Sequence, residues 1–196
     1  FISVFLNLMK LQLGCGLETT YHRCDNGKTH WYAVDLPHVI QYRRGLLPEP
    51  EREFYISGDG FVKDWIIKVR NDVPDAPVLV TAGGLLHYFE ENKVISLLRM
   101  IGQSGNMEVV FDTVNKKGMA MMQKKYMKQV GHADAQMFFY VDAAKELAAK
   151  IRGNVKVIAE EPYYRYIPKN GLKLSTKVSM AVSDQFKMVK MIHLKL

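Results

Sequence analysis

The chain has 196 residues, of which 48% are hydrophobic, so it can bury one sizeable core but not two large ones. No apolar run approaches the ~20 residues that a transmembrane helix needs. The net charge of +7 comes from 27 basic and 20 acidic residues spread along the whole chain, without a basic arm or an RNA-binding aromatic signature. We therefore expect an anionic small-molecule partner, with neither a nucleic acid nor a membrane as partner.

The cysteines and histidines show no metal-binding or disulfide pattern. Cys15 and Cys24 form neither a zinc-type spacing nor a disulfide framework, and the six histidines share no ligand spacing. The sequence therefore predicts reduced thiols, a cytoplasmic location and no bound metal.

The sequence begins at Phe1, and the apolar stretch from Phe1 to Leu13 is long for a single strand. We expect further residues before Phe1 in the complete protein, and we treat 1–196 as a single domain.

Strand and helix patterns alternate along the chain, as they do in a parallel sheet with helices on both faces. We predict seven strands, which are a strand ending at Leu13 and strands over His30–Val34, Glu53–Ser57, Val78–Thr81, Met107–Phe111, Val155–Ala159 and Phe186–Leu196. We predict helices between them over Leu17–Arg23, Pro37–Arg44, Lys63–Val69, Glu90–Ile101, Lys116–Val130 and Asp142–Ile151. We expect Lys187, Lys190 and Lys195 on the solvated face of the last strand. The order predicts an α/β fold.

Gly14-Cys15-Gly16 follows the first strand and precedes a helix, which is the arrangement of a nucleotide-binding corner. The dinucleotide version has a third glycine three positions later, but Thr19 stands there, which disfavours NAD. An ordinary tight turn remains the alternative.

Asp35 ends the second strand, nineteen positions after Gly16, close to the ~20 expected of an acid that binds ribose hydroxyls. Asp59, with Gly60 after the third strand, is placed to border an adenine amino group, and Leu36 to lie against the ring. A solvated loop position for Asp35 and a helix-capping role for Asp59 remain the alternatives.

Gly83 and Gly84 follow the fourth strand and Ala82, at the expected crevice of the sheet, where a side chain would block a ligand. His87 follows them and is the candidate general base, with Tyr88 beside it. A hydrogen-bonded wall residue is the alternative role for His87.

Three segments together resemble the leucine carboxyl methyltransferase family, which includes bacterial O-methyltransferases of polyketide synthesis. They are residues 13–20 (LGCGLETT), 31–37 (WYAVDLP) and 82–89 (AGGLLHYF). The resemblance covers residues 12–111 and implies a Rossmann-like class I methyltransferase fold, with a mostly parallel sheet of about seven strands, an antiparallel last strand and helices on both faces.

The resemblance also implies S-adenosyl-L-methionine as cofactor and S-adenosyl-L-homocysteine as product. It places Gly14 and Gly16 along the methionine part, Asp35 at the ribose, and Asp59 with Gly60 at the adenine. Cys15, Leu36, Ala82 and Gly83 are the further cofactor-binding residues that it implies. Two features depart from the family. Gly83 replaces an acidic residue that contacts the cofactor's amino group, and the N-terminal helical extension of the family is absent from this chain.

The sequence therefore predicts an O-methyltransferase that acts on a carboxylate, or a phenol, of a small acidic molecule. A carboxylate with a pKa near 4 is ionised at neutral pH and needs no base, whereas a phenol near 10 benefits from one. A protein C-terminal carboxyl methyltransferase, a nicotinamide oxidoreductase and a non-catalytic module with the same fold remain the alternatives.

Overall fold

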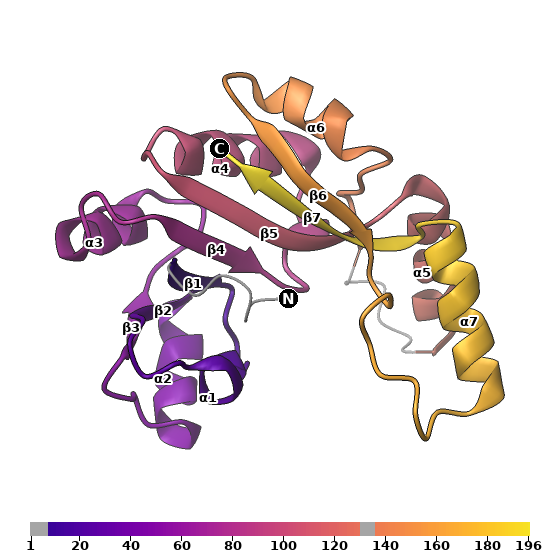
Figure 1. Cartoon of the computed structure of the whole chain (residues 1–196), viewed down its shortest axis with the longest axis horizontal. Helices are drawn as coiled ribbons and strands as arrows, with labels where there is room; N and C mark the ends of the chain where they lie inside the picture. Colours follow the sequence, from indigo (N-terminus) through magenta and orange to yellow (C-terminus); the bar gives the residue numbers. More distant parts are fainter. Residues whose placement is uncertain (1–7, 130–135) are drawn as a thin grey trace.

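A computed structural model describes residues 8–129 and 136–196 of the chain (Figure 1). The strands are β1 Met9–Leu13, β2 Trp31–Asp35, β3 Glu53–Ser57, β4 Val78–Ala82, β5 Met107–Val114, β6 Lys156–Pro162 and β7 Val189–Lys195. The helices are α1 Thr20–Cys24, α2 Pro37–Leu46, α3 Asp64–Asp72, the 3-10 helix η2 Leu86–Tyr88, α4 Glu91–Gly102, α5 Lys116–Gln129, α6 Ala144–Ile151 and α7 Leu174–Gln185. Within the described ranges, no helix is both long and apolar enough to cross a bilayer.

The strands form one sheet in the order β3-β2-β1-β4-β5-β7-β6. The pairs β1–β2, β2–β3, β1–β4 and β4–β5 are parallel, and β7 runs antiparallel to both β5 and β6. The predicted α/β fold, with its antiparallel last strand, is confirmed. Strands β2 and β3 lie on one side of β1, whereas β4 and β5 lie on its other side. The strand order therefore reverses between the neighbouring strands β1 and β4.

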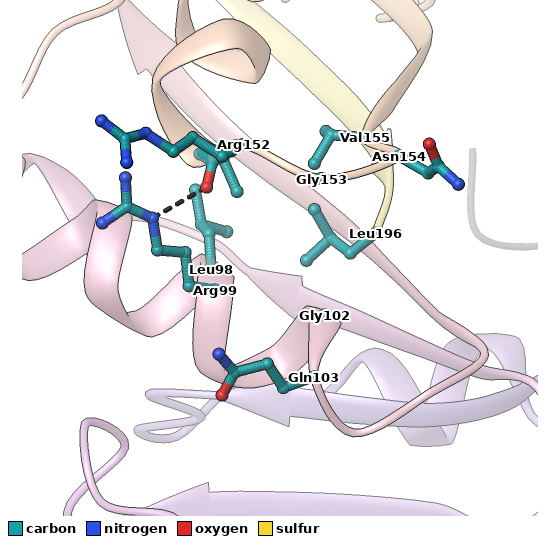
Figure 2. Close-up of a pocket in the computed structure, with 10 residues that line it drawn as sticks. Leu98, Arg99, Gly102, Gln103, Arg152, Gly153, Asn154, Val155 and Leu196 are labelled. Atoms are coloured by element: carbon teal, nitrogen blue, oxygen red, sulfur yellow. Dashed lines mark hydrogen bonds between the residues drawn. The ribbon is translucent and has the colours of Figure 1, made fainter.

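Helices α4 and α6 lie side by side, and Arg99 of α4 ties them together (Figures 1 and 2). Its Nε donates to the carbonyl of Ile151 at 2.7 Å and its Nη2 to that of Lys150 at 2.6 Å, and these carbonyls at the end of α6 have no partner within the helix. A cavity of about 490 Å³ adjoins this contact, with Gly102 and Leu196 in its wall. It lies at the amino ends of the parallel strands.

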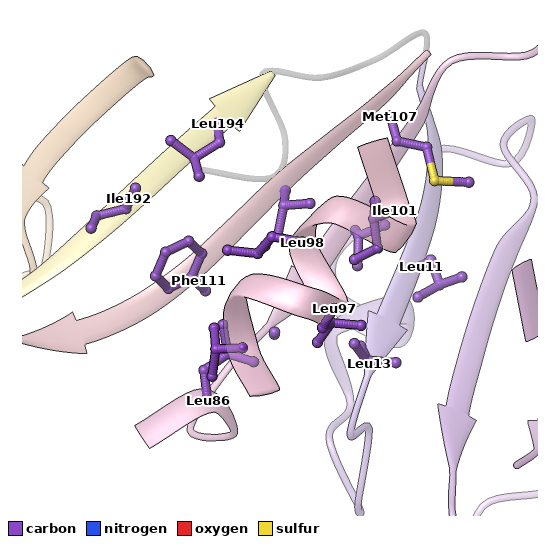
Figure 3. Close-up of a cluster of buried hydrophobic side chains, with 14 of the residues drawn as sticks. Leu11, Leu13, Leu86, Leu97, Leu98, Ile101, Met107, Phe111, Ile192 and Leu194 are labelled. Atoms are coloured by element: carbon purple, nitrogen blue, oxygen red, sulfur yellow. The ribbon is translucent and has the colours of Figure 1, made fainter. Parts of the chain in front are cut away.

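Side chains alternate between the two faces of the sheet, as the strand geometry requires. On β2, Tyr32 and Val34 join the main core beneath α3, α4 and α6, whereas Ala33 points to the other face and joins Ile40 of α2. Leu98 of α4 lies in the middle of the main core, close to Phe111 of β5 in Figure 3. The core therefore holds the helices on the sheet.

Most predicted elements are confirmed with shifts of a few residues, but the structure corrects the bounds of two of them and adds one helix. The helix predicted from Leu17 begins at Thr20, and the last strand begins at Val189 instead of Phe186. Helix α7 was not predicted, because its Ser, Thr and Val residues are weak helix formers and only Met180 and Ser183 of the helix are buried. Residues 1–7 of the first apolar stretch, and Val130, lie outside the described residues.

The expectation that Lys190 lies on a solvated strand face is wrong. Lys190 is 1% exposed, and its Nζ donates to Glu160 Oε1 and to the carbonyl of Asp142, each at 2.7 Å. Glu160 also accepts from the N–H of Ala144 at the start of α6. Burial alone would raise the pKa of Glu160, but these hydrogen bonds outweigh it and the pKa falls below its usual value. The lysine thus attaches α6 to the β6–β7 edge.

We predict that Leu98→Ala lowers the free energy of unfolding by about 2–5 kcal/mol, because it leaves a cavity in the main core. Leu46→Ala, at a residue that is 54% exposed, is the control and should cost less than about 0.5 kcal/mol. Chemical denaturation followed by circular dichroism measures both values, and equal losses for the two variants would contradict the placement of the core.

Candidate functional site

The carboxyl ends of β1 and β4 meet where the strand order reverses, which is where open α/β sheets bind ligands. The turn after β1 needs glycine, because φ is +67° at Gly14 and +47° at Gly16. A Cβ atom on Gly14 would lie 2.8 Å from the side chain of Leu85, whereas a Cβ on Gly16 would meet nothing within 4 Å. Gly14 therefore packs against the loop after β4, and Gly16 faces open space.

Asp35 points from the end of β2 toward this turn. Its Oδ2 accepts from the N–H of Gly16 at 2.8 Å, and its Oδ1 accepts from the N–H of Leu36 at 2.7 Å. The residue is half-buried, and each carboxylate oxygen retains a lone pair after these contacts. The carboxylate thus lies beside the glycine turn at the carboxyl end of β2 and can accept further hydrogen bonds there.

A buried arginine that the sequence did not reveal binds the backbone of the glycine turn after β1. Arg43 of α2 is fully buried, and its Nη1 donates to the carbonyls of Gly16 at 3.1 Å and Glu18 at 2.8 Å. Its Nη2 pairs with the equally buried Glu53 of β3 at 3.1 Å, and its guanidinium lies 4.7 Å from the ring centre of Tyr55. Burial raises the pKa of Glu53 although Arg43 opposes the shift. The ion pair therefore fixes the backbone on which the crevice is built.

The side chain of Cys15 turns away from the crevice. It is 3% exposed and packs with Ala33, Ile40 and Tyr55 under α2. Burial raises the pKa of this thiol to about 12, so it stays protonated. A ligand contact at Cys15, which the sequence predicts, would have to use its backbone.

The residues predicted to border an adenine lie along the turns after β2 and β3. Asp59 is exposed, and its Oδ1 accepts from the N–H of Phe61 at 2.8 Å, which leaves Oδ2 available. A Cβ on Gly60 would approach the side chain of Leu13 to 2.9 Å, and Leu36 is 43% exposed. The structure thus gives Asp59 a local turn-capping contact without using up its carboxylate.

The turn after β4 forms the other wall of the crevice. Ala82 is buried, whereas Gly83 and Gly84 are exposed. The N–H of Gly84 donates to Asp112 Oδ1 at 2.6 Å, so a β5 carboxylate that the sequence analysis overlooked positions this turn. A Cβ on Gly83 would lie 3.9 Å from Oε2 of Glu18. The Glu18 side chain therefore reaches the β4 side from the β1 side.

His87 and Tyr88 form a short 3-10 helix after this turn, and their ring centres lie 4.4 Å apart. The carbonyl of His87 accepts from the N–H of Phe138 at 2.8 Å. Burial lowers the pKa of His87 below its usual 6.5, opposed by the carboxylate of Asp112, so the imidazole is neutral at pH 7. A neutral imidazole can accept a proton, as the predicted role requires.

Among residues 8–129 and 136–196, no three His, Cys, Asp or Glu side chains form a group that could hold a metal. The cavity beside Arg99 lies at the amino ends of the parallel strands, whereas the glycine turns follow their carboxyl ends. The cavity therefore takes no part in this site.

The supporting residues were missed because their partners are remote in the sequence. Arg43 bonds to residues 27 and 25 positions earlier, and Asp112 to one 28 positions earlier. Nothing in the local pattern around them distinguishes them from surface charges.

We predict that Arg43→Met lowers the free energy of unfolding by about 3–5 kcal/mol, because it leaves the Glu53 carboxylate buried without its cation. The double variant Arg43→Met with Glu53→Met should regain part of the loss. Arg44→Met is the matched control on the same helix, since its pair with Glu49 is exposed and worth about 0–1 kcal/mol. If denaturation midpoints show the same small loss for both single variants, the anchoring role of Arg43 is wrong.

No protein-family model matches the chain. Over 116 residues the chain is 34% identical to the tetracenomycin polyketide synthesis O-methyltransferase TcmP of Streptomyces glaucescens, a match that covers 58% of the chain and 42% of that protein. Over 155 residues it is 30% identical to the S-adenosyl-L-methionine-dependent methyltransferase dpfgK of Gibberella zeae, covering 73% of the chain and 51% of that protein. The chain spans about half the length of these curated relatives.

The structure is similar to that of the O-methyltransferase NcsB1 from neocarzinostatin biosynthesis, solved with S-adenosylmethionine and 2-hydroxy-5-methyl naphthoic acid. The TM-score is 0.59 at 12% sequence identity, over 96% of this chain and 49% of NcsB1. At this identity the similarity concerns the fold alone. Together with the strand order, it shows that the chain has the Rossmann-like fold of class I S-adenosylmethionine-dependent methyltransferases.

Proposed function

We propose that the chain is the cofactor-binding and catalytic part of an S-adenosylmethionine-dependent O-methyltransferase of the leucine carboxyl methyltransferase family. Its substrate is a carboxylate, or a phenol, on a small acidic or polyketide-like molecule. One observation carries the proposal: the carboxylate of Asp35 bonds to Gly16 N–H in the glycine turn at the point where the strand order reverses.

The described residues fit an adenosyl ligand. The open space beside Gly16 and Gly84 gives room for a chain to pass close to the backbone. Asp35 has lone pairs for two ribose hydroxyls, Asp59 Oδ2 is available to an adenine amino group, and the exposed Leu36 can lie against the base. Gly14, Cys15, Gly60, Ala82 and Gly83 would complete the contacts through their backbones.

When bound, S-adenosylmethionine supplies a methyl group on a sulfonium, which transfers in line to an oxygen nucleophile. The chain's own residues position the two reactants and exclude water. A carboxylate substrate is already ionised and needs only positioning. A phenol would lose its proton to His87, with Tyr88 against the imidazole ring.

Two observations support a small acidic or polyketide-like substrate. The net charge of +7 attracts anions, and TcmP is by its name a polyketide O-methyltransferase. We place the protein in the cytoplasm, since Cys15 and Cys24 are both free thiols. A panel of aromatic hydroxy acids, set against a peptide with a free C-terminal carboxylate, distinguishes a small-molecule enzyme from a protein methyltransferase.

We predict that Asp35→Asn weakens S-adenosylhomocysteine binding about ten- to hundredfold, because the ribose hydroxyls lose a charged acceptor. Isothermal titration calorimetry measures the affinity. Asp75→Asn is the control, because Asp75 is exposed and precedes the amino end of β4, away from the glycine turns. This variant should leave the affinity unchanged. Unaltered binding by the Asp35 variant would count against the proposal, and absence of binding by the wild-type chain would remove it.

The lowered pKa of His87 predicts the pH dependence for a phenolic substrate. The basic imidazole form prevails above its pKa, so kcat/KM should hold level from neutral pH downward and fall only below about pH 6.5. His87→Gln should reduce turnover of a phenol about 100-fold and leave that of a carboxylic acid nearly unchanged. Equal effects on both substrates would exclude the role of base.

A further inference from the structure

Glu18 is an acidic residue whose side chain reaches from the turn after β1 to the turn after β4. It follows the turn after β1, and its Oε2 lies 3.9 Å from the position that a Cβ on Gly83 would take at the end of β4. Among the residues that the structure describes, and apart from the two chain neighbours of Gly83, this carboxylate oxygen is the one atom within 4 Å of that position. A negative charge therefore stands next to an open volume inside the proposed cofactor site.

One oxygen of this carboxylate is engaged and the other is available. Oε1 accepts from the Thr20 hydroxyl and from Arg23 Nη2. Oε2 has no hydrogen-bond partner among the residues that the structure describes. The pair with Arg23 is exposed, with side chains 64% and 45% accessible, and such pairs contribute little. Thr20 and Arg23 thus orient the side chain without neutralising the oxygen that faces Gly83.

The backbone of Glu18 is fixed from the core. Its carbonyl accepts from Nη1 of the buried Arg43 at 2.8 Å, and its N–H donates to the carbonyl of Cys15 at 2.9 Å. The nearby Asp112 is less available, since its Oδ1 already holds the N–H of Gly84. Burial raises the pKa of Tyr163, and the negative charges of Asp112 and Glu18 add to the shift.

We propose that Glu18 binds the α-ammonium group of the cofactor's amino-acid part across Gly83. This inference rests on the proposed function, because it takes the amino-acid part to run between the two glycine turns. An ammonium beside Oε2 would form a charge-assisted hydrogen bond, the strong class of such contacts. Glycine at position 83 leaves the room that the ammonium needs, whereas a second acid there would stand against Glu18 and repel it.

Glu18→Gln tests the proposal, because it removes the charge and keeps the shape of a side chain that is nearly half exposed. Calorimetry on the full chain compares S-adenosylhomocysteine with 5′-methylthioadenosine, which has the same adenosine and thioether but no amino-acid part. We expect S-adenosylhomocysteine to bind about ten- to hundredfold more weakly and methylthioadenosine to bind within about twofold of wild type. Arg23→Gln, which keeps the carboxylate, should leave both affinities unchanged.

Adding Gly83→Glu to the Glu18→Gln variant should restore S-adenosylhomocysteine binding, because the new carboxylate would enter the same space from the opposite wall. Equal losses for the two ligands, or no loss for either, would overturn the role of Glu18 while leaving the proposed function intact. Asp35→Asn provides the contrast, since it should weaken both ligands. If the wild-type chain binds neither ligand, the proposed function fails and this inference fails with it.

Discussion

The crevice depends on one buried guanidinium. Arg43 carries a full charge into a region with no solvent access, where it is tolerated only because Glu53 and two backbone carbonyls surround it. Those carbonyls belong to Gly16 and Glu18, so the cost of burying the charge is offset by bonds that also hold the turn. The shape of the ligand site is therefore coupled to the stability of the α2–β3 packing.

The second wall is fixed by a separate set of contacts. Asp112 of β5 holds Gly84, and Leu85 packs against Gly14 so closely that a Cβ at position 14 would force the Leu85 side chain to shift. Each wall thus has its own carboxylate, Asp35 on the β2 side and Asp112 on the β5 side, bonded to a glycine N–H. The glycines provide conformational freedom and open space, and the carboxylates restrict that freedom to one arrangement.

The strands were predictable because their patterns are local. Residues 53–57 and 78–81 are short apolar runs with turn residues on both sides, and the structure places strands there. Helix α7 shows the opposite case. Its apolar residues Leu174, Val178 and Val182 recur at helical spacing, but the Ser, Thr and Val residues of the segment are weak helix formers. Those three apolar residues are exposed in the structure, and Met180 and Ser183 are the buried residues of the helix.

The sequence by itself determined the order of the strands and of the helices before α7, the two glycine turns and Asp35 at the end of the second strand, because each depends on neighbours within a few residues. Only the tertiary structure decided that Arg43 lies behind the first turn, that Asp112 holds the second, that the thiol of Cys15 is buried and that Glu18 faces Gly83. These contacts join segments that meet only after the parallel strands have paired. Their geometry follows from sheet order and register, which no local pattern encodes.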